Sequence, residues 1–347
     1  MRVLIIKIAA IGDTIMAMPM LTALRERYPT AHIVWICSET TADLVRLIGQ
    51  IEIIAVNERK LLRGSLFERA SEAIKVWTRL RWQRFDLAAV GHTNPLFRAL
   101  AITASVKEWK SLPSIRLRRR VWAVPGRYHG DEYVRLINQI DGPAAKRAEL
   151  PVLKVALPQT LLSLLGGSAT GLIVLAPGGA KNPIDEQPLR RWPVESYRLM
   201  AAELLMRGFR VALTGGPSDS WVSTAFAQLP VIDLIGKTAL TDQLALFEAC
   251  ALVITHDSGP LHLAQLAGVP TVALFGPTNP SEKVRDAKRI RVIWGGDKLV
   301  CRPCYDNKDY APCSDNQCMK DISVQEAVRA AEEMIALNRF RPAARAS

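Results

Sequence analysis

The chain has 347 residues, of which 49% are apolar and 22% charged, a composition that supports folded cores and excludes an intrinsically disordered chain. At roughly 100–200 residues per domain, this length predicts about two domains. No stretch approaches the roughly 18 uninterrupted apolar residues of a membrane-spanning helix, and the N-terminus lacks the long apolar core of a secretory signal. We therefore expect a cytoplasmic protein.

The net charge of +12 is unevenly distributed along the chain. Residues 1–165 hold 25 Lys and Arg against 14 Asp and Glu, whereas residues 166–347 hold 20 against 19. This asymmetry predicts an anionic partner for the N-terminal half. Nucleic acid, an anionic membrane surface and a phosphorylated substrate all fit the charge.

The first half alternates short apolar runs with amphipathic stretches, which is typical of strands and helices in β-α-β order. In chain order, we expect a strand at 3–8, a helix at 14–27, a strand at 32–37, a helix at 40–48, and strands at 51–56 and 85–90. The rhythm weakens across residues 107–165. A helix is expected there near 130–140, followed by a linker near 157–170.

A second alternating series begins at residue 172. Its expected strands are 172–176, 209–214, 231–235, 252–255 and 271–275, and its expected helices are 194–207, 218–228, 241–250, 260–267 and 323–337. The two series predict an α/β protein of two Rossmann-like domains, 1–165 and 166–347, with parallel sheets facing across a cleft. Ligands of such sheets bind outside the carboxyl ends of the strands.

The first strand is followed by a short loop that contains Gly12 and Asp13 and opens the first helix. This is the place of a dinucleotide site, but the G-x-G-x-x-G pattern is absent. Asp13 has two interpretations. It is either a helix N-cap, or a general base that takes a proton from an acceptor hydroxyl.

Several strands of the second half end in small or polar residues. Gly179 would let a backbone approach a phosphate, and Lys181 adds positive charge. Arg190 and Arg191 precede a helix that Pro193 opens, and a cation beside a helix N-terminus suits a diphosphate. A solvated basic pair is the alternative. Weaker signals of the same kind are the strand-end residues Thr214, Gly215, Gly236 and Lys237.

Residues 256–264 give the strongest signal, because a strand meets a helix N-terminus flanked by polar residues. The free N–H groups at Ser258 and Gly259 suit a phosphate, with His262 nearby. The Asp257 carboxylate would repel a phosphate but can accept hydrogen bonds from sugar hydroxyls. As an N-cap alone, Asp257 or Ser258 would be ordinary.

Two motifs together resemble glycosyltransferase family 9, the ADP-heptose:lipopolysaccharide heptosyltransferases. They are Gly12-Asp13-Thr14-x4-Pro19 and Asp257-Ser258-Gly259-Pro260-x-His262-Leu263-Ala264. Supporting segments are Arg191-Trp192-Pro193, Leu234-x-Gly236-Lys237-Thr238 and Phe275-Gly276-Pro277-Thr278. The resemblance covers about residues 1–337 in the family's order.

The resemblance implies a GT-B fold, with the acceptor on the N-terminal domain and the nucleotide sugar on the C-terminal domain. A heptose would pass from ADP-heptose to a lipopolysaccharide inner-core acceptor with inversion, and Asp13 would be the general base. No metal or other cofactor would be required, because a helix dipole and a cation stabilise the leaving diphosphate. Alternatives are another nucleotide sugar or glycan acceptor, or a non-catalytic module that binds a sugar nucleotide or a lipid.

The family pattern also assigns donor-binding roles. Arg190, where a lysine is more usual, would contact the donor phosphates, and Gly236 and Lys237 would lie along the adenine pocket. Asp257 would hold the heptose hydroxyls. The diphosphate would lie near the amides of Ser258 and Gly259 and near His262.

The basic charge of the first half is concentrated in two places. Residues 61–82 interleave aromatic, aliphatic and basic side chains, which fits either a helix packed on the sheet or a helix on a membrane surface. The densest cluster is Arg116, Arg118, Arg119 and Arg120, which we expect to bind the acceptor. A phosphorylated glycolipid in the anionic inner face of the inner membrane would explain both, with the protein bound peripherally. No nucleic-acid-binding motif is present, so nucleic acid is not expected.

Six cysteines occur, and four of them lie close together in the sequence. Cys37 and Cys250 fall in predicted core elements. The other four could hold a structural zinc, form disulfides or remain free thiols. They are Cys301, Cys304, Cys313 and Cys318. We do not infer a catalytic metal from them.

Overall fold

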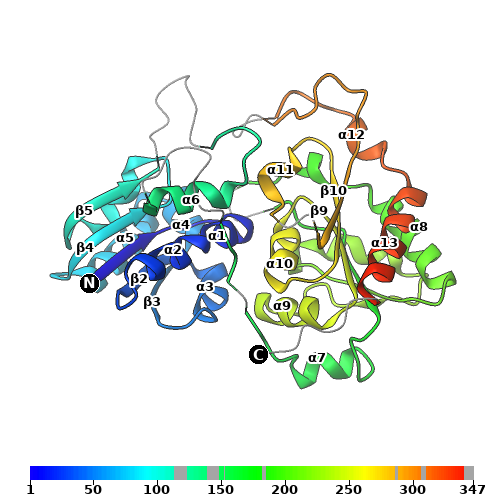
Figure 1. Ribbon diagram of the computed structural model, residues 1–347, viewed down its shortest axis with the longest axis horizontal. Helices are drawn as coiled ribbons and strands as arrows, with labels where there is room; N and C mark the ends of the chain where they lie inside the picture. The colour runs from blue at the N-terminus through cyan, green and yellow to red at the C-terminus, as the bar shows by residue number, and fades with distance from the viewer. Residues whose placement is uncertain are drawn as a thin grey trace. The chain divides into compact units, whose positions relative to one another are not determined.

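The computed structural model describes residues 1–112, 123–138, 148–151, 153–181, 185–285, 288–305 and 310–339. The chain divides into two compact units, the first holding Met1–Leu153 and the second holding Lys154–Lys181 and Glu186–Ser347. Each unit contains one parallel sheet covered by helices (Figure 1). The predicted α/β class, with one Rossmann-like unit in each half of the chain, is therefore confirmed.

The first unit is built on five parallel strands in the order β3-β2-β1-β4-β5. They are β1 (Arg2–Ile6), β2 (His32–Ser38), β3 (Ile51–Val56), β4 (Arg84–Val90) and β5 (Ser105–Ser111). Alternate residues of a strand face opposite sides of the sheet. Leu4 and Ile6 of β1 accordingly share one buried face, where they form a core with Val76 and Leu80 of the helix that follows β3.

In the described residues of the first unit, seven helical segments accompany this sheet. They are α1 (Ile11–Ala17), α2 (Pro19–Arg27), α3 (Glu39–Arg46), α4 (Glu58–Arg63), α5 (Leu66–Leu80), the 3₁₀ helix η1 (Pro95–Ala101) and α6 (His129–Asn138). Helices α1 and α2 both pack against α6. The single helix expected at 14–27 is two helices, because Pro19 lacks an N–H group and therefore begins α2 instead of continuing α1.

The basic stretch at 61–82 also contains a break between two helices. Gly64 ends α4, and the Ser65 and Glu68 side chains form a capping box that begins α5. Beyond its first turn, α5 packs on the sheet as an ordinary amphipathic helix. Its first two residues do not, because Leu66 and Phe67 are 84% and 82% exposed.

The second unit is built on six parallel strands in the order β11-β10-β9-β6-β7-β8. They are β6 (Leu172–Ala176), β7 (Arg210–Leu213), β8 (Ile232–Asp233), β9 (Leu252–His256), β10 (Thr271–Phe275) and β11 (Ile290–Trp294). The helical segments are α7 (Gln159–Leu164), η2 (Pro188–Arg190), α8 (Val194–Met206), η3 (Pro217–Phe226), α9 (Leu240–Ala249), α10 (Gly259–Ala267), α11 (Pro280–Lys283), α12 (Gln317–Lys320) and α13 (Val324–Arg339). One face of the sheet packs against α8 and α13.

Further elements differ from the expected ones. Strands β5 and β11 were not expected, and both are edge strands. In β5 the exposed charged residues Lys107 and Glu108 weaken the apolar pattern, whereas β11 is largely apolar and carries one charged residue, Arg291. The helix expected at 218–228 is the 3₁₀ helix η3.

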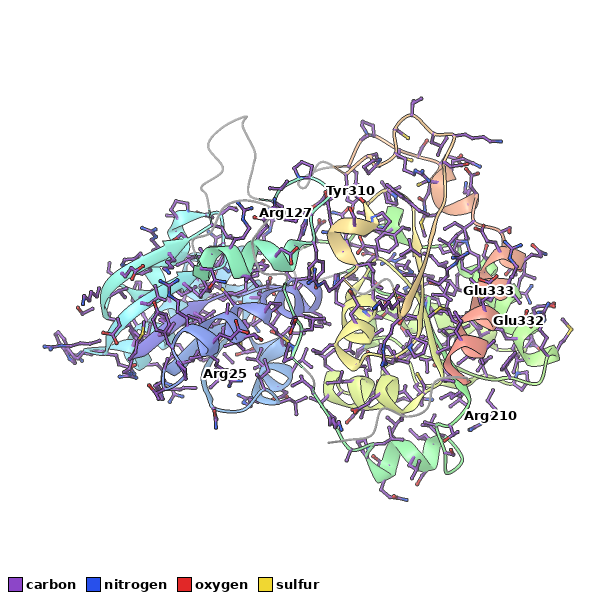
Figure 2. All side chains as sticks on the ribbon, in the orientation of Figure 1. Arg25, Arg127, Arg210, Tyr310, Glu332 and Glu333 are labelled. Carbon is purple, nitrogen blue, oxygen red and sulfur yellow. The ribbon has the colours of Figure 1, made fainter. Side chains whose placement is uncertain are left out.

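The first unit ends at Leu153, earlier than the expected boundary at residue 165. The reason is that the segment containing α7 is tied to the second unit. The Val155 N–H donates to Glu248 Oε2 at 3.0 Å. Arg210, which is labelled in Figure 2, donates to the carbonyls of Ser168 and Leu165. Residues 154–165 therefore belong to the second unit.

Candidate active site

Asp13 lies in the first turn of α1, beyond the carboxyl end of β1. The N-cap of α1 is Ala10, so Asp13 is the third residue of the helix and does not cap it. The Asp13 side chain is exposed, whereas the next residue, Thr14, is fully buried and donates from Oγ1 to the Ala9 carbonyl at 3.1 Å. The loop thus presents Asp13 at the surface on a helix start anchored by Thr14.

A buried lysine lies behind Asp13. Lys7 follows β1, is 7% exposed, and places its Nζ 5.2 Å from the centre of the Tyr133 ring. Burial alone would lower the pKa of Lys7, but its interactions with Tyr133 and Asp13 outweigh burial and raise that pKa. Lys7 is therefore a buried ammonium ion that interacts with the candidate base, Asp13.

A second carboxylate lies near Lys7 and Asp13. Glu58, the first residue of α4, is 6% exposed and bonds to the Ser38 side chain. Burial and the nearby Asp13 carboxylate raise the pKa of Glu58, while Ser38 and Lys7 partly oppose them. No local sequence pattern indicates that Lys7, Asp13 and Glu58 gather in one place.

His92 closes the other side of this loop. Its Nε2 accepts a hydrogen bond from the Ile8 N–H at 2.9 Å, and its ring stacks on Phe97 at 3.6 Å. Burial and Lys7 hold the pKa of His92 well below its usual value, so the ring is neutral, with its proton on Nδ1. The expected acceptor-binding residues Arg116, Arg118, Arg119 and Arg120 lie outside the described residues.

In the second unit, one carboxylate joins the turns that follow β6 and β7. Asp219 is 5% exposed and accepts from the Gly179 N–H at 2.9 Å and from the Gly216 N–H at 2.8 Å. A Cβ atom at Gly178 would lie 2.5 Å from Asp219 Cγ, and one at Gly215 would lie 2.9 Å from Asp219 Oδ2. Both turns therefore require glycine because Asp219 fills the space beside them.

The Gly179 backbone is held on its carbonyl side as well. Arg191 donates to the Gly179 carbonyl from Nε at 3.0 Å and from Nη2 at 2.8 Å, and it also bonds to Glu186 at 2.7 Å. Lys181 is half-exposed and pairs with Glu186 at 3.6 Å. The turn expected to cradle a phosphate is thus rigid, but the Gly179 N–H is already engaged.

A largely buried ion pair of the second unit joins Arg190 to Asp257. Arg190 Nη1 lies 3.6 Å from Asp257 Oδ2, and the same oxygen accepts from Thr278 Oγ1 at 2.8 Å. Asp257 is 2% exposed, and its Oδ1 is buried with no hydrogen-bond partner in the described part of the chain. Burial would raise the pKa of Asp257, but Arg190, Lys283 and His262 outweigh it and keep the carboxylate ionised.

Arg190 is held by aromatic residues as well as by Asp257. Its guanidinium lies 5.6 Å from the centre of the Tyr305 ring and 5.7 Å from that of Tyr310, and its Nε donates to the Tyr310 hydroxyl. Burial opposes the charge, but Asp257 and Tyr310 raise the pKa of Arg190 further. The cation expected to contact donor phosphates is therefore fixed in place.

The N-terminus of α10 lies beside the Gly179 turn. Ser258 is its N-cap but makes no side-chain capping bond, because its hydroxyl donates to the His256 carbonyl at 3.3 Å. A Cβ atom at Gly179 would lie 3.3 Å from Ser258 Oγ, so the two segments touch. Gly259 begins α10, and His262, one turn later, is 4% exposed. Gly179, Arg190, Asp257 and Ser258 thus form one site.

The ends of β7 and β8 extend this site. The Gly236 N–H donates to the Gly215 carbonyl at 3.0 Å, which joins the two turns. Thr214 and Thr238 each have a buried hydroxyl oxygen with no partner in the described ranges. Lys237 donates from Nζ to the Asp233 carbonyl at 2.8 Å.

The four clustered cysteines are free thiols in the structure. Burial raises the pKa of Cys318 to about 11 and also raises that of Cys304. Among the described residues, no group of three or more His, Cys, Asp or Glu side chains is arranged to hold a metal ion. The described part of the chain therefore gives no support to the zinc alternative for these cysteines.

The sequence did not reveal the residues that support the expected site residues by contacting them. Asp219, Tyr310, Lys7 and Glu58 hold or surround the expected ones, but only Asp219 had a local signal. It stands three residues after Gly216, the spacing at which an acidic side chain reaches back to a helix start.

We predict that Asp219→Ala loosens both glycine turns. Each lost hydrogen bond contributes about 1 kcal/mol, so the free energy of unfolding should fall by about 2 kcal/mol in a denaturant titration. Asp242→Ala is the matched control, because Asp242 accepts a single backbone bond, from the Ala239 N–H at 3.0 Å, at the start of α9. An Asp219→Ala protein no less stable than that control would contradict the role of Asp219.

Comparison with known proteins places the chain in a family. Residues 133–314, more than half of the chain, match the model of glycosyltransferase family 9 (heptosyltransferase). The lipopolysaccharide heptosyltransferase 2 of Escherichia coli is 26% identical over 97% of this chain and 98% of that protein. The lipooligosaccharide heptosyltransferase 2 of Haemophilus influenzae is 31% identical over 43% of this chain and 44% of that protein.

The fold agrees with this match. The structure of E. coli ADP-heptose lps heptosyltransferase II superposes with a TM-score of 0.73 at 20% identity, over 98% of this chain and 100% of that one. The predicted GT-B fold is therefore confirmed. The chain belongs to glycosyltransferase family 9, the heptosyltransferases, and is a glycosyltransferase.

Proposed function

We propose that this protein transfers a heptose from ADP-heptose to an inner-core acceptor of lipopolysaccharide, with inversion and with Asp13 as the general base. The acceptor hydroxyl would lose its proton to Asp13 while its oxygen bonds to the anomeric carbon and ADP departs with the electrons of the broken bond. The names of the relatives support the sugar and the glycolipid. No metal is needed in this proposal, since Arg190 and the α10 N-terminus can stabilise the diphosphate.

The observation that carries the proposal is the unpaired oxygen of Asp257. One oxygen is held by Arg190 and Thr278, and the other is a buried acceptor without a partner in the described residues. A buried carboxylate oxygen costs free energy unless a donor reaches it. A sugar hydroxyl supplies such a donor, whereas a phosphate does not.

Nucleotide selectivity tests the donor. We expect calorimetry with ADP, GDP, UDP and CDP to show selective binding of ADP, equal with and without magnesium, and transfer to follow when ADP-heptose and a heptose-deficient lipopolysaccharide are supplied. Preference for another nucleotide would reject ADP-heptose in favour of another nucleotide sugar. Binding of ADP-heptose without transfer to any core acceptor would favour the non-catalytic module.

Asp13→Ala tests the base. Removing a general base slows proton transfer by about a hundredfold to ten-thousandfold, so kcat should fall by that factor while the Kd for ADP stays unchanged. Asp43→Ala is the control, because Asp43 is also an exposed carboxylate of the first unit, pairing with Arg46 on α3. Full activity of Asp13→Ala would remove Asp13 as the base.

We further propose that the junction of α4 and α5 binds an anionic membrane surface, where the glycolipid acceptor resides. Leu66 and Phe67 are almost fully exposed there, next to the exposed basic residues Arg63 and Arg69. Exposed apolar side chains beside cations are typical of peripheral membrane contacts. In the described parts of the chain, no helix is long and apolar enough to cross a membrane.

Vesicle sedimentation tests this surface. We expect binding to phosphatidylglycerol vesicles that weakens as salt is raised, and at least tenfold weaker binding for the double variant Leu66→Ser, Phe67→Ser, because each buried side chain contributes about 1.5–3 kcal/mol. Met206→Ser is the control, since Met206 is 75% exposed on the second unit. Equal binding of both variants would show that the α4–α5 junction is not the contact.

A further inference from the structure

A buried polar cluster lies at the carboxyl edge of the first unit's sheet. We define the Lys7 cluster as Lys7, Asp13, Ser38, Glu58 and Tyr133. Lys7 and Asp13 follow β1, Ser38 ends β2, and Glu58 follows β3. Because β3, β2 and β1 are parallel neighbours, their carboxyl ends meet at one edge. The topology therefore brings two carboxylates and one ammonium ion together from distant parts of the sequence.

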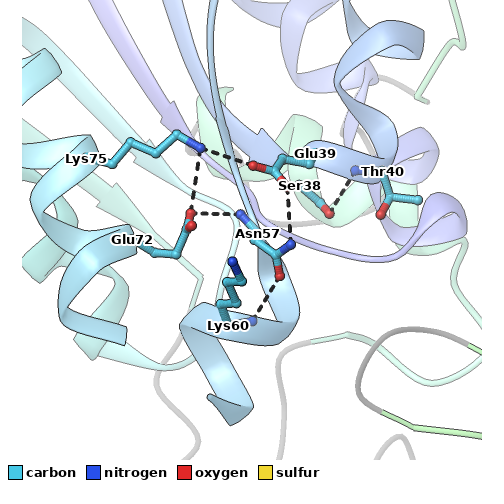
Figure 3. A network of polar contacts seen from close by, with 7 residues as sticks. All are labelled: Ser38, Glu39, Thr40, Asn57, Lys60, Glu72 and Lys75. Atoms are coloured by element: carbon cyan, nitrogen blue, oxygen red, sulfur yellow. Dashed lines mark hydrogen bonds and ion pairs between the residues drawn. The ribbon is translucent and has the colours of Figure 1, made fainter. Parts of the chain in front are cut away.

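A network of hydrogen bonds and ion pairs around the preceding residue, Asn57, holds Glu58 in this cluster. Asn57 caps α4 by accepting from the Lys60 N–H at 3.0 Å, and its own N–H donates to Glu72 Oε2 at 2.9 Å (Figure 3). Its amide group also donates to Glu39 Oε2 at 3.2 Å. Lys75 bridges the two glutamates, 3.0 Å from Glu39 and 3.8 Å from Glu72 (Figure 3).

This network fixes the start of α4. Glu58, the residue after Asn57, therefore faces the interior of the first unit. The position has an electrostatic cost, because Glu58 is 6% exposed and interacts with the like charge of Asp13. Only one of its oxygens is satisfied, since Oε2 has no hydrogen-bond partner within the described segments. A purely structural carboxylate at this depth would have both oxygens bonded.

The charge balance of the cluster explains what Glu58 contributes. Lys7 interacts with both Asp13 and Glu58. If Asp13 were alone with Lys7, the cation would stabilise the carboxylate and make it a poor proton acceptor. A second carboxylate offsets the field of the cation. As Asp13 takes up a proton, the repulsion between the two carboxylates is relieved.

We propose that Glu58 is a positioning residue for the general base: its negative charge offsets that of Lys7 and makes Asp13 a stronger proton acceptor. This inference rests on the proposed function, in which Asp13 takes the proton of the acceptor hydroxyl. That proton passes to Asp13, and Glu58 neither gains nor loses one during transfer.

The other groups around Glu58 do not supply this charge. Ser38 and Tyr133 are neutral hydroxyl groups, and His92 is a neutral ring on the far side of Lys7. Glu72 is a buried carboxylate on α5, but it bonds to the Asn57 N–H outside the cluster and pairs with Lys75. Substitution of Glu72 therefore provides a matched control for substitution of Glu58.

The experiment is the pH dependence of kcat/KM for heptose transfer, whose acid limb reports protonation of the base in the free enzyme. Removing a neighbouring negative charge favours the ionised base, so Glu58→Gln should move the acid limb to lower pH by about one unit. Removing the cation has the opposite sign, so Lys7→Met should move it to higher pH. Glu58→Asp, which keeps the charge, and Glu72→Gln should leave the limb at its wild-type position.

An unshifted limb in Glu58→Gln would overturn the inference, and so would an equal shift in Glu72→Gln, which would indicate a general loosening of α4. If Glu58→Gln does not fold, as judged by thermal unfolding, the acid limb of Lys7→Met tests the inference instead. A shift to higher pH supports it, and an unshifted limb or a shift to lower pH overturns it. Asp13→Asn separates this inference from the proposed function. An active Asp13→Asn enzyme removes the base itself, whereas an inactive one with a wild-type limb in Glu58→Gln removes only the role of Glu58.

Discussion

The ion pair of Arg190 and Asp257 is the interaction on which the second unit's site depends. Moving a carboxylate out of water costs several kcal/mol, roughly, even in a real protein interior, so a buried aspartate persists only with a partner. Arg190 supplies the charge, and the Thr278 hydroxyl fixes the same oxygen. One oxygen of Asp257 is thereby left as an oriented acceptor at the edge of the sheet.

The two units surround their buried carboxylates with different partners. In the second unit, the buried carboxylates are paired: Asp257 has a guanidinium and a hydroxyl, and Asp219 has two backbone N–H groups. In the first unit, Glu58 has one oxygen without a hydrogen bond among the described residues, as Asp257 does, but it faces another carboxylate, that of Asp13. A buried carboxylate that faces a like charge is more typical of a site that moves protons than of one that binds a ligand.

The sequence predicted the strands of both sheets well where they are central and apolar, as in residues 3–8 and 172–176. It failed at the edge strand β5, whose charged residues interrupt the apolar pattern, and at Pro19, which divides one amphipathic stretch into two helices. It also omitted the edge strand β11, although four of its five residues are apolar. Asp13, Arg190 and Asp257 could be found because motifs mark them. Lys7 and Glu58 could not, because they come together only through strand order, which a local pattern does not encode.

The contacts of Asp219 have a thermodynamic consequence for ligand binding. Glycine loses more conformational entropy than any other residue when its backbone is fixed. The turns around Gly179 and Gly216 are already fixed in the folded protein by the Asp219 carboxylate, and Arg191 holds the Gly179 carbonyl. The entropy of ordering these turns is lost during folding and not when a ligand arrives. A nucleotide that binds beside them therefore meets a preorganised backbone, and its affinity is not reduced by the flexibility that glycine-rich loops otherwise bring.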